Sequence, residues 1–242
     1  GGWESMAARD SIAAQALQGV PFFANLQEDH AGELAGKLVP RRFGPNQVIF
    51  HLGDPGGLLY LISRGKVKIS HTTPDGQEVV LAILGTGDFF GELALLDDAP
   101  RSATAVALEP TETWTLHRAE FMQYLSDNPN FALHVLKTLA RHIRRLNTQL
   151  ADIFFLDLPG RLARVLLNLS EQYGRKTQEG IQIELSLTQT DLAEMTGATR
   201  VSINKALGRF RRAGWIRVNG RRVTVLDEGA LRGLIEVSGG DV

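Results

Sequence analysis

The stretch FFGELALLDDAPRSATAVAL, residues 89–108, brings a single arginine to the start of an apolar strand. Residues 103–108 (ATAVAL) have the composition of a buried strand, and Arg101 and Ser102 directly precede them. A buried charge is costly unless it is paired. Arg101 therefore needs a partner, which is either a protein carboxylate, such as Glu92 or Asp97, or a bound anion.

The residues ahead of Arg101 suit a nucleotide. Gly91 allows backbone amides to approach an anion, and the short helix expected after it directs its N-terminus toward negative charge. Arg101 can bind a phosphate through two parallel hydrogen bonds. Glu92 would be repelled by that phosphate, so we expect it to accept hydrogen bonds from hydroxyl groups, as from a ribose. A phosphate beside a sugar hydroxyl indicates a nucleotide as the ligand.

Around this stretch, residues 20–126 form short apolar runs separated by the turn sequences GPN, GDPGG, PDG and GTGD. This spacing predicts an all-β roll or barrel of hairpins. Residues 66–84 (KVKISHTTPDGQEVVLAIL) are a hairpin candidate with PDG as the turn. Residues 118–129 (RAEFMQYLSDNP) then predict a helix that ends at Asn128–Pro129.

Residues 129–158 have the pattern of one long helix. Apolar residues recur along it at alternating steps of three and four, namely Leu136, Leu139, Ile143, Leu146, Leu150 and Ile153. This apolar seam is typical of a coiled coil. A parallel helix in a second copy of the chain would bury it, which predicts a homodimer; the alternative is that the seam packs on the protein's own sheet. Residues 157–160 (DLPG) are expected to end the helix and to form a hinge.

The last third of the chain predicts a winged helix. Thr188 and Asp191 resemble a capping box at the start of one short helix, Gly197 makes a turn, and Thr199 caps a second helix. Two short helices joined by a glycine turn form a helix-turn-helix, whose second helix is shaped to enter a DNA major groove. Residues 215–226 (WIRVNGRRVTVL) then alternate around an Asn219–Gly220 turn, which predicts the hairpin of the wing.

Positive charge gathers in the same region. Eight basic residues and no acidic residue fall between residues 195 and 226, which leaves −9 for the rest of a chain whose net charge is −1. The eight are Arg200, Lys205, Arg209, Arg211, Arg212, Arg217, Arg221 and Arg222. Such asymmetry favours a nucleic-acid partner, and a solvated basic face is the alternative. Its coincidence with the helix-turn-helix favours DNA binding.

Composition excludes several other classes. The chain has 242 residues, 43% hydrophobic and 22% charged, which suits a soluble protein of two domains or of one large domain. No apolar run approaches the ~20 residues of a membrane helix, and no signal peptide is recognisable, so we expect a cytoplasmic protein without a membrane partner. The chain has no cysteine and six scattered histidines, which excludes iron–sulfur clusters and supports no metal site. No nucleophile–base pair or P-loop is present, so we do not expect an enzyme.

Nearly the whole chain, residues 19–236, resembles the cyclic AMP receptor protein (CRP/FNR) family of bacterial transcription regulators. The resemblance rests on GELALLDDAPRSA, on the long helix ending FFLDLPGR and on TQTDLAEMTGATRVSINKAL, in that order along the chain. It implies an α+β fold with three parts. These are a cyclic-nucleotide-binding, jelly-roll-like β-roll at residues 6–128, a dimerisation helix at 129–158, and a winged helix-turn-helix DNA-binding domain at 159–242.

The resemblance also implies residue roles in binding cAMP. Arg101 and Ser102 would bind the cyclic phosphate and Glu92 the 2′-hydroxyl, and Ser102, rather than a threonine, is similar to cAMP-binding members. The family contacts adenine through two adjacent polar residues of the long helix, and Leu146 and Asn147 stand at those positions. Leu146 departs from the pattern, which predicts weaker selection for adenine. The predicted ligand-binding residues are Gly91, Glu92, Leu93, Arg101, Ser102, Leu146 and Asn147.

For DNA, the resemblance places Arg200 and Lys205 at positions that contact guanine. Val201 stands where the family has a glutamate and Lys205 where it has a second arginine, so we expect an altered or relaxed half-site within a palindrome. Arg209, Arg211, Arg212, Arg221 and Arg222 are expected on phosphates. The predicted DNA-binding residues are Thr188, Thr199, Arg200, Ser202, Asn204, Lys205, Arg209 and Arg221.

The implied mechanism is allosteric: bound nucleotide alters packing around residues 146–160 and reorients the two winged helices for DNA. The implied partners are double-stranded DNA, a second copy of the chain and RNA polymerase. The alternative is a regulator of the same family that needs no effector or senses another small anion. A gas or redox sensor is disfavoured because neither cysteines nor clustered histidines are available for iron–sulfur or haem sites.

Overall fold

The computed structural model describes residue 34 and residues 36–238. The chain divides into two compact units, residues 1–141 and 142–242, which are described separately below. The boundary between the units falls inside the long helix α5 (Pro129–Phe155). Residues 6–33 of the predicted β-roll domain lie outside the described residues.

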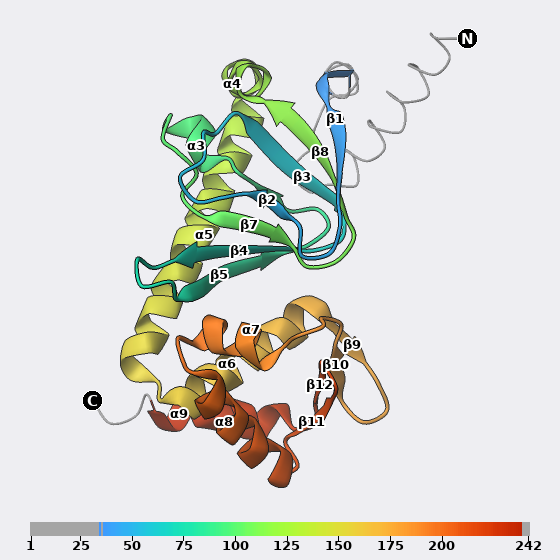
Figure 1. Ribbon diagram of the computed structural model, residues 1–242, viewed down its shortest axis with the longest axis vertical. Coiled ribbons are helices and arrows are strands. Elements are labelled where there is room, and N and C mark those ends of the chain that lie inside the picture. Colours follow the sequence, from blue (N-terminus) through green and yellow to red (C-terminus); the bar gives the residue numbers. More distant parts are fainter. Residues whose placement is uncertain (1–33, 35, 239–242) are drawn as a thin grey trace. The chain divides into compact units, whose positions relative to one another are not determined.

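The first unit is built on two four-stranded antiparallel sheets (Figure 1). One sheet has the order β1-β8-β3-β6 and the other the order β2-β7-β4-β5. The strands are β1 (Val39–Phe43), β2 (Val48–Phe50), β3 (Leu58–Arg64), β4 (Val67–Thr72), β5 (Glu78–Leu84), β6 (Phe89–Phe90), β7 (Thr104–Ala107) and β8 (Thr111–His117). This arrangement confirms the predicted β-roll.

Local turn signals place the strands correctly. The PDG turn joins β4 to β5, with Thr72 paired to Glu78 next to the loop. The short helix α3 (Leu93–Leu96) lies between β6 and β7, and α4 (Arg118–Asp127) follows β8 and ends at Asn128, as expected. The main core of the unit joins buried leucines of β3 and β8 to Phe121 of α4 and to Phe131 and Val135 of α5.

The long helix α5 ends earlier than the sequence predicted. It ends at Phe155, and Leu158 and Pro159 begin the next helix, α6 (Leu158–Tyr173). Asp157 caps α6, since its Oδ1 accepts a hydrogen bond from the backbone N of Gly160 at 2.9 Å. The long helix thus breaks beside DLPG as predicted, but DLPG begins the following helix instead of ending α5, because proline suits the first turn of a helix, where its missing N–H costs nothing.

The second unit contains the expected helix-turn-helix and wing (Figure 1). Its elements after α6 are β9 (Gly174–Lys176), β10 (Ile181–Ile183), α7 (Gln189–Thr196), α8 (Arg200–Arg212), β11 (Ile216–Asn219), β12 (Arg222–Val225) and α9 (Glu228–Ser238). The predicted hairpin β11–β12 is part of a four-stranded sheet of order β11-β12-β10-β9. The strands β9 and β10 were not predicted. The α+β fold class is confirmed.

The described part of the chain contains neither a candidate membrane span nor a candidate metal site. None of its helices combines the length and apolar character that crossing a membrane requires. No group of three or more His, Asp or Glu side chains lies together there as a metal ion would require.

Candidate functional site

Arg101 lies on the segment between α3 and β7, where two backbone hydrogen bonds hold it in place. Its N–H donates to the carbonyl of Asp54 at 2.9 Å, and its carbonyl accepts from the N–H of Gly53 at 2.8 Å. Nearby, Thr104 Oγ1 accepts from the N–H of Leu52 at 3.0 Å. These bonds fix the start of β7 to the turn that follows β2.

The side chain of Arg101 is buried, with 4% of the residue exposed. Its Nη1 donates to the carbonyl of Gly91 at 2.7 Å and its Nη2 to the carbonyl of Leu58 at 2.8 Å. Its Nε is buried and has no hydrogen-bond partner among the described residues. Burial lowers the pKa of this guanidinium, while the charges of Tyr60, Glu92 and Asp54 raise it.

The alternative of a plain ion pair for Arg101 was wrong. Within the described residues, no carboxylate lies at ion-pair distance from its guanidinium. Asp97 instead accepts from the N–H of Ala99 at 3.1 Å. The hydrogen bonds of this buried guanidinium go only to neutral carbonyl groups, so no protein carboxylate neutralises its positive charge. The site is therefore suited to an anion.

Gly91 is required at its position for two reasons. Its φ is +85°, a conformation in the left-handed region that other residues rarely adopt. A Cβ at this position would also lie 2.6 Å from Arg101 Nη1 and 3.1 Å from the carbonyl oxygen of Leu58. The glycine thus allows the guanidinium to lie directly against the backbone.

Glu92 is the second buried ionisable group of the site, with 7% of the residue exposed. Burial raises the pKa of its carboxyl group above the ordinary value, and a backbone hydrogen bond and the charge of Arg101 oppose the shift. Such a carboxylate gains from hydroxyl donors that replace its lost hydration. Glu92 also occupies the cap position of α3, in a helical conformation and without a side-chain cap bond.

The other two predicted ligand-binding residues of this unit lie at the surface. Leu93, the first residue of α3, is 43% exposed. Ser102 follows Arg101 directly and is also exposed. The structure therefore brings together Gly91, Glu92 and Arg101, with Leu93 and Ser102 adjacent to them along the chain.

An aromatic cluster that was not predicted from the sequence lies beside Arg101. The Cζ of Arg101 lies 4.2 Å from the ring centroid of Phe50 and 5.8 Å from that of Tyr60. Tyr60 also stacks on Phe90, with the ring centroids 5.0 Å apart and the planes at 10°. These aromatic residues come from β2, β3 and β6, and no local pattern in the sequence links them to Arg101.

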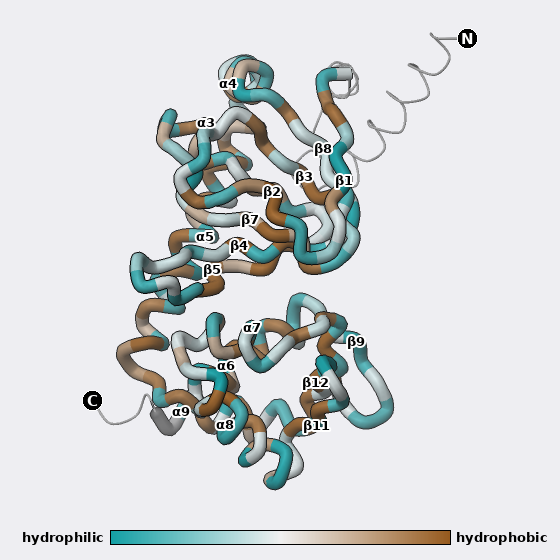
Figure 2. Tube along the Cα trace, in the orientation of Figure 1, coloured by the Kyte–Doolittle hydropathy of each residue, from teal (hydrophilic) through white to brown (hydrophobic). Residues whose placement is uncertain are grey.

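The two residues predicted to contact the base lie on α5 after the unit boundary. Leu146 is 49% exposed, and Asn147 is exposed as well. The other seam residues Leu136, Ile143, Leu150 and Ile153 are 55–62% exposed, and the hydropathy along the C-terminal part of α5 is visible in Figure 2. Of the seam, Leu139 packs partly against the core of the first unit. In the first unit, Leu136 is 62% exposed, so the sheets of that unit do not cover it.

The helix-turn-helix has the predicted caps. Thr188 Oγ1 accepts from the N–H of Asp191 at 3.0 Å, and Asp191 Oδ2 accepts from the N–H of Thr188 at 2.7 Å, which completes the capping box. Gly197 ends α7 with a φ of +63°. Thr199 Oγ1 then caps α8 by accepting from the N–H of Ser202 at 3.2 Å. These local bonds set the turn between the two helices.

The second helix, α8, buries one face and exposes the other. Ile203, Ala206, Leu207 and Phe210 are buried in the unit. The exposed residues include the predicted DNA contacts Arg200, Asn204, Lys205 and Arg209, together with Val201, which is 65% exposed. Ser202 is half-buried, and Asn204 Oδ1 accepts from Gln189 Nε2 at 3.3 Å.

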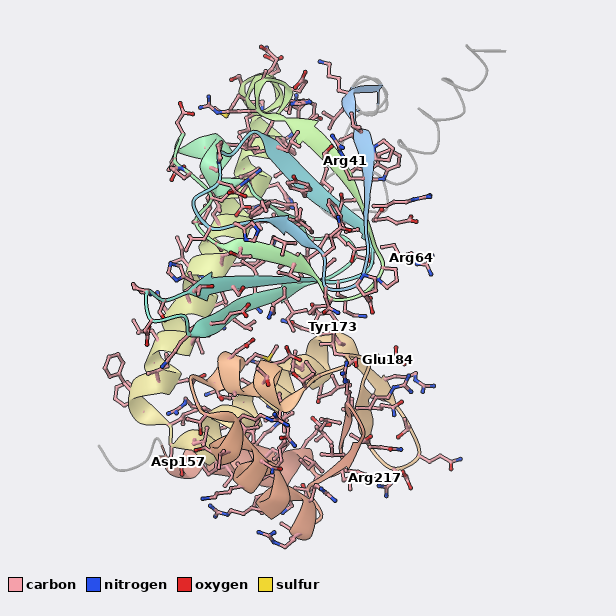
Figure 3. All side chains as sticks on the ribbon, in the orientation of Figure 1. Arg41, Arg64, Asp157, Tyr173, Glu184 and Arg217 are labelled. Carbon is pink, nitrogen blue, oxygen red and sulfur yellow. The ribbon has the colours of Figure 1, made fainter. Side chains whose placement is uncertain are left out.

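The eight basic residues between residues 195 and 226 are almost all without a carboxylate partner in the described part of the chain. Of the eight between residues 195 and 226, only Arg217 forms an ion pair with a carboxylate of the described chain. Its partner is Glu179 of the β9–β10 loop, and Figure 3 shows Arg217 on the small sheet. Arg221 and Arg222, at the wing turn, are exposed.

Comparison with known proteins agrees with these features. Residues 40–128 match the cyclic nucleotide-binding domain and residues 160–234 the Crp-like helix-turn-helix domain. The CRP-like cAMP-activated global transcriptional regulator of Mycobacterium tuberculosis is 38% identical over 220 residues, which cover 90% of this chain and 96% of that protein. The global nitrogen regulator of Nostoc sp. is 31% identical over 189 residues, which cover 77% of this chain and 85% of that protein.

A solved CRP-family transcriptional regulator from Thermus thermophilus superposes with a TM-score of 0.70 at 28% identity, covering 81% of this chain and 96% of that one. The family resemblance predicted from the sequence is thus confirmed, as is the expectation of a regulator and not an enzyme. This chain belongs to the CRP/FNR family of transcription regulators, with a cyclic nucleotide-binding domain and a Crp-like helix-turn-helix that binds DNA.

Proposed function

We propose that this protein is a homodimeric transcription regulator that cAMP activates for binding to palindromic double-stranded DNA. The observation that carries the proposal is the buried guanidinium of Arg101, whose Nε lacks a partner among the described residues, next to the buried carboxyl group of Glu92. The two groups fit the two polar parts of a cyclic nucleotide. The cAMP-activated relative of M. tuberculosis, at 38% identity, supports the choice of cAMP.

Each part of the ligand has a proposed partner. Arg101 Nε and Ser102 bind the cyclic phosphate, with Gly91 allowing the close approach of the backbone. Glu92 accepts a hydrogen bond from the ribose 2′-hydroxyl. Leu146 and Asn147 of the dimerisation helix face the base, and Leu93 is the remaining member of the site.

The proposed domains are a β-roll at residues 6–128, a dimerisation helix at 129–158 and a DNA-binding domain at 159–242. A second copy of the chain covers the exposed seam of α5, because a helix with such an apolar stripe needs a partner. The proposed hinge is at residues 157–160, of which Asp157 lies between α5 and α6 and Leu158 begins α6.

In the DNA complex, Arg200 and Lys205 contact guanine edges in the major groove, and Ser202 and Asn204 lie beside them. Thr188, Thr199, Arg209 and Arg221 contact the phosphate backbone. Because several phosphates are neutralised at each half-site, DNA affinity falls steeply with salt. RNA polymerase is the proposed partner of the DNA-bound dimer.

Calorimetric titration with cAMP, and with cGMP as the reference ligand, tests the proposal. We expect micromolar binding of cAMP to the wild type and loss of the heat signal in Arg101→Ala. Arg64→Ala is a matched control, because Arg64 is an exposed arginine at the end of β3 in the same unit (Figure 3). Binding that survives Arg101→Ala would contradict the assignment of the phosphate.

A second candidate is a regulator of this family with another effector or with none. It is favoured by the Nostoc relative, which is named for nitrogen regulation and is 31% identical. If neither cyclic nucleotide produces heat with the wild type, while the protein still binds DNA, this second candidate replaces the first.

A further inference from the structure

Phe50 lies at the end of β2 and presents its ring to the guanidinium of Arg101. The distance from Arg101 Cζ to the Phe50 centroid is 4.2 Å, well inside the range of a cation–π contact. The next aromatic ring, that of Tyr60, lies at 5.8 Å. Phe50 therefore makes the shorter of the two ring contacts with this charge.

The ring completes a set of restraints on the guanidinium. Two backbone carbonyls hold one edge, with Nη1 on Gly91 at 2.7 Å and Nη2 on Leu58 at 2.8 Å. The Phe50 ring centroid lies 4.2 Å from Arg101 Cζ, so the carbonyls set the direction of the guanidinium and the ring sets its tilt. The Nε–H, which has no partner among the described residues, is left as the donor for a ligand.

Phe50 is itself held in place by other rings. Its centroid lies 5.7 Å from that of Tyr60 and 5.8 Å from that of Phe90, with the planes tilted by 46° and 39°. Tyr60 and Phe90 stack on each other between the paired strands β3 and β6. Phe50, Tyr60 and Phe90 thus form an aromatic cluster, and within it Phe50 is the ring nearest to Arg101.

From this geometry we infer that Phe50 is a positioning residue for the nucleotide phosphate: it orients Arg101 so that Nε faces the ligand, without contacting the phosphate itself. The inference rests on the proposed function, because it assigns a task to the anion-binding arginine. An aliphatic side chain at position 50 would fill space but would provide no electron-rich face for the cation.

Phe50→Leu and Phe50→Tyr separate the aromatic face from simple space filling. We expect Phe50→Leu to weaken cAMP binding about tenfold, equal to about 1.4 kcal/mol. Phe50→Tyr keeps the ring and should stay within about threefold of the wild type. Calorimetry on the full chain measures both, and Phe50→Met replaces the leucine variant if that variant does not fold. Equal affinity of Phe50→Leu and the wild type would overturn the inference.

Phe90→Leu is the matched control. Phe90 belongs to the same aromatic cluster and is 3% exposed, but its ring contacts are with Phe50 and Tyr60 and not with Arg101. We expect Phe90→Leu to lower the melting temperature while cAMP affinity changes by less than about threefold. If Phe90→Leu weakens cAMP binding as much as Phe50→Leu does, the effect belongs to the core in general and the inference fails.

A spectroscopic measurement keeps this test separate from that of the proposed function. The Nε–H resonance of Arg101, assigned by its loss in Arg101→Lys, should show the ring-current shift of Phe50 and should lose it in Phe50→Leu but not in Phe90→Leu. Absence of cAMP binding by the wild type counts against the proposed function. A Nε–H resonance that stays unchanged in Phe50→Leu counts against the positioning role, whether or not cAMP binds.

Discussion

At the scale of single residues, burial without an ion pair distinguishes Arg101 and Glu92 in the proposed nucleotide site. Burial shifts the pKa values of Arg101 and Glu92 toward their neutral forms, downward for the guanidinium and upward for the carboxyl group. Neither group is relieved by an ion pair with the other. The site therefore holds two charges that a ligand with an anion and a hydroxyl group stabilises better than the protein alone does.

The pKa shift of Glu92 predicts a pH dependence of binding. A raised carboxyl pKa contributes stability to the ligand-free protein at low pH that is lost as the pH rises through the folded-state pKa. A hydroxyl donor favours the carboxylate, so cAMP binding lowers this pKa and releases a proton. The affinity for cAMP should fall as the pH falls through the raised pKa, by at most about tenfold per pH unit.

Calorimetry over a pH series, in buffers of different ionisation enthalpy, measures both the affinity and the released proton. Glu92→Gln cannot titrate at this position, so its weaker binding should lose the pH dependence. A wild type and a Glu92→Gln variant with parallel pH profiles would show that another group is responsible.

Val201 predicts a contact of a different kind. It is 65% exposed on the face of α8 that we propose enters the major groove, where its methyl groups would suit the C5-methyl group of thymine. Burying one methyl group contributes about 0.8 kcal/mol, or roughly fourfold in affinity. Replacing one particular thymine of a selected half-site by deoxyuridine should therefore weaken wild-type binding by about that factor.

The measurement is a fluorescence anisotropy titration with each thymine replaced in turn. Val201→Ala should bind the thymine and deoxyuridine forms of that site equally well, because it lacks the facing methyl groups. If no position shows a loss that depends on Val201, the contact does not exist.

At the scale of elements, the exposed seam of α5 predicts the oligomeric state. Ile143 is 59% exposed in the single chain, and a second copy of the helix would bury it. Burying an isoleucine contributes about 1.5–3 kcal/mol, and two glutamates facing each other add repulsion. Ile143→Glu should therefore weaken the dimer by at least about a hundredfold.

Sedimentation velocity over a concentration series detects this change. Lys137→Glu introduces the same side chain on the same helix at an exposed polar position and should remain dimeric. A dimer of unchanged stability in Ile143→Glu would mean that another surface joins the copies.

Elements that are set by neighbouring residues could be predicted from the sequence, whereas elements that depend on pairing with distant segments could not. The capping box at Thr188 and Asp191 and the Asn219–Gly220 turn act within a few residues, so their patterns identified α7 and the wing hairpin. Strands β9 and β10 are only three residues each, and β10 joins the sheet by pairing with β12, which no local pattern records. The contact of Phe50 with Arg101 likewise joins positions 51 residues apart, through the pairing of β2 with β7.

At the scale of the whole molecule, charge divides along the chain. The eight basic residues lie between residues 195 and 226, and the rest of the chain carries a net charge of −9. The net negative charge repels DNA, whereas the basic residues of the helix-turn-helix and wing attract it. This distribution favours DNA binding at the second unit, which contains all eight basic residues. An effector bound at Arg101, as we propose, would then act on DNA bound to the second unit through the conformation of the chain.

Coupling between an effector site and a DNA site is reciprocal. If cAMP raises the affinity for DNA by some factor, thermodynamic linkage requires DNA to raise the affinity for cAMP by the same factor, typically about 5–150-fold. Titrating cAMP with and without a saturating palindromic fragment measures one side of the cycle, and titrating DNA with and without cAMP measures the other. Arg101→Ala should keep the DNA affinity of the free wild type but lose its response to cAMP, because its DNA-binding unit is unchanged. Equal cAMP affinities with and without DNA would mean that the two sites are uncoupled, and the nucleotide would then have no means of controlling transcription through this helix-turn-helix.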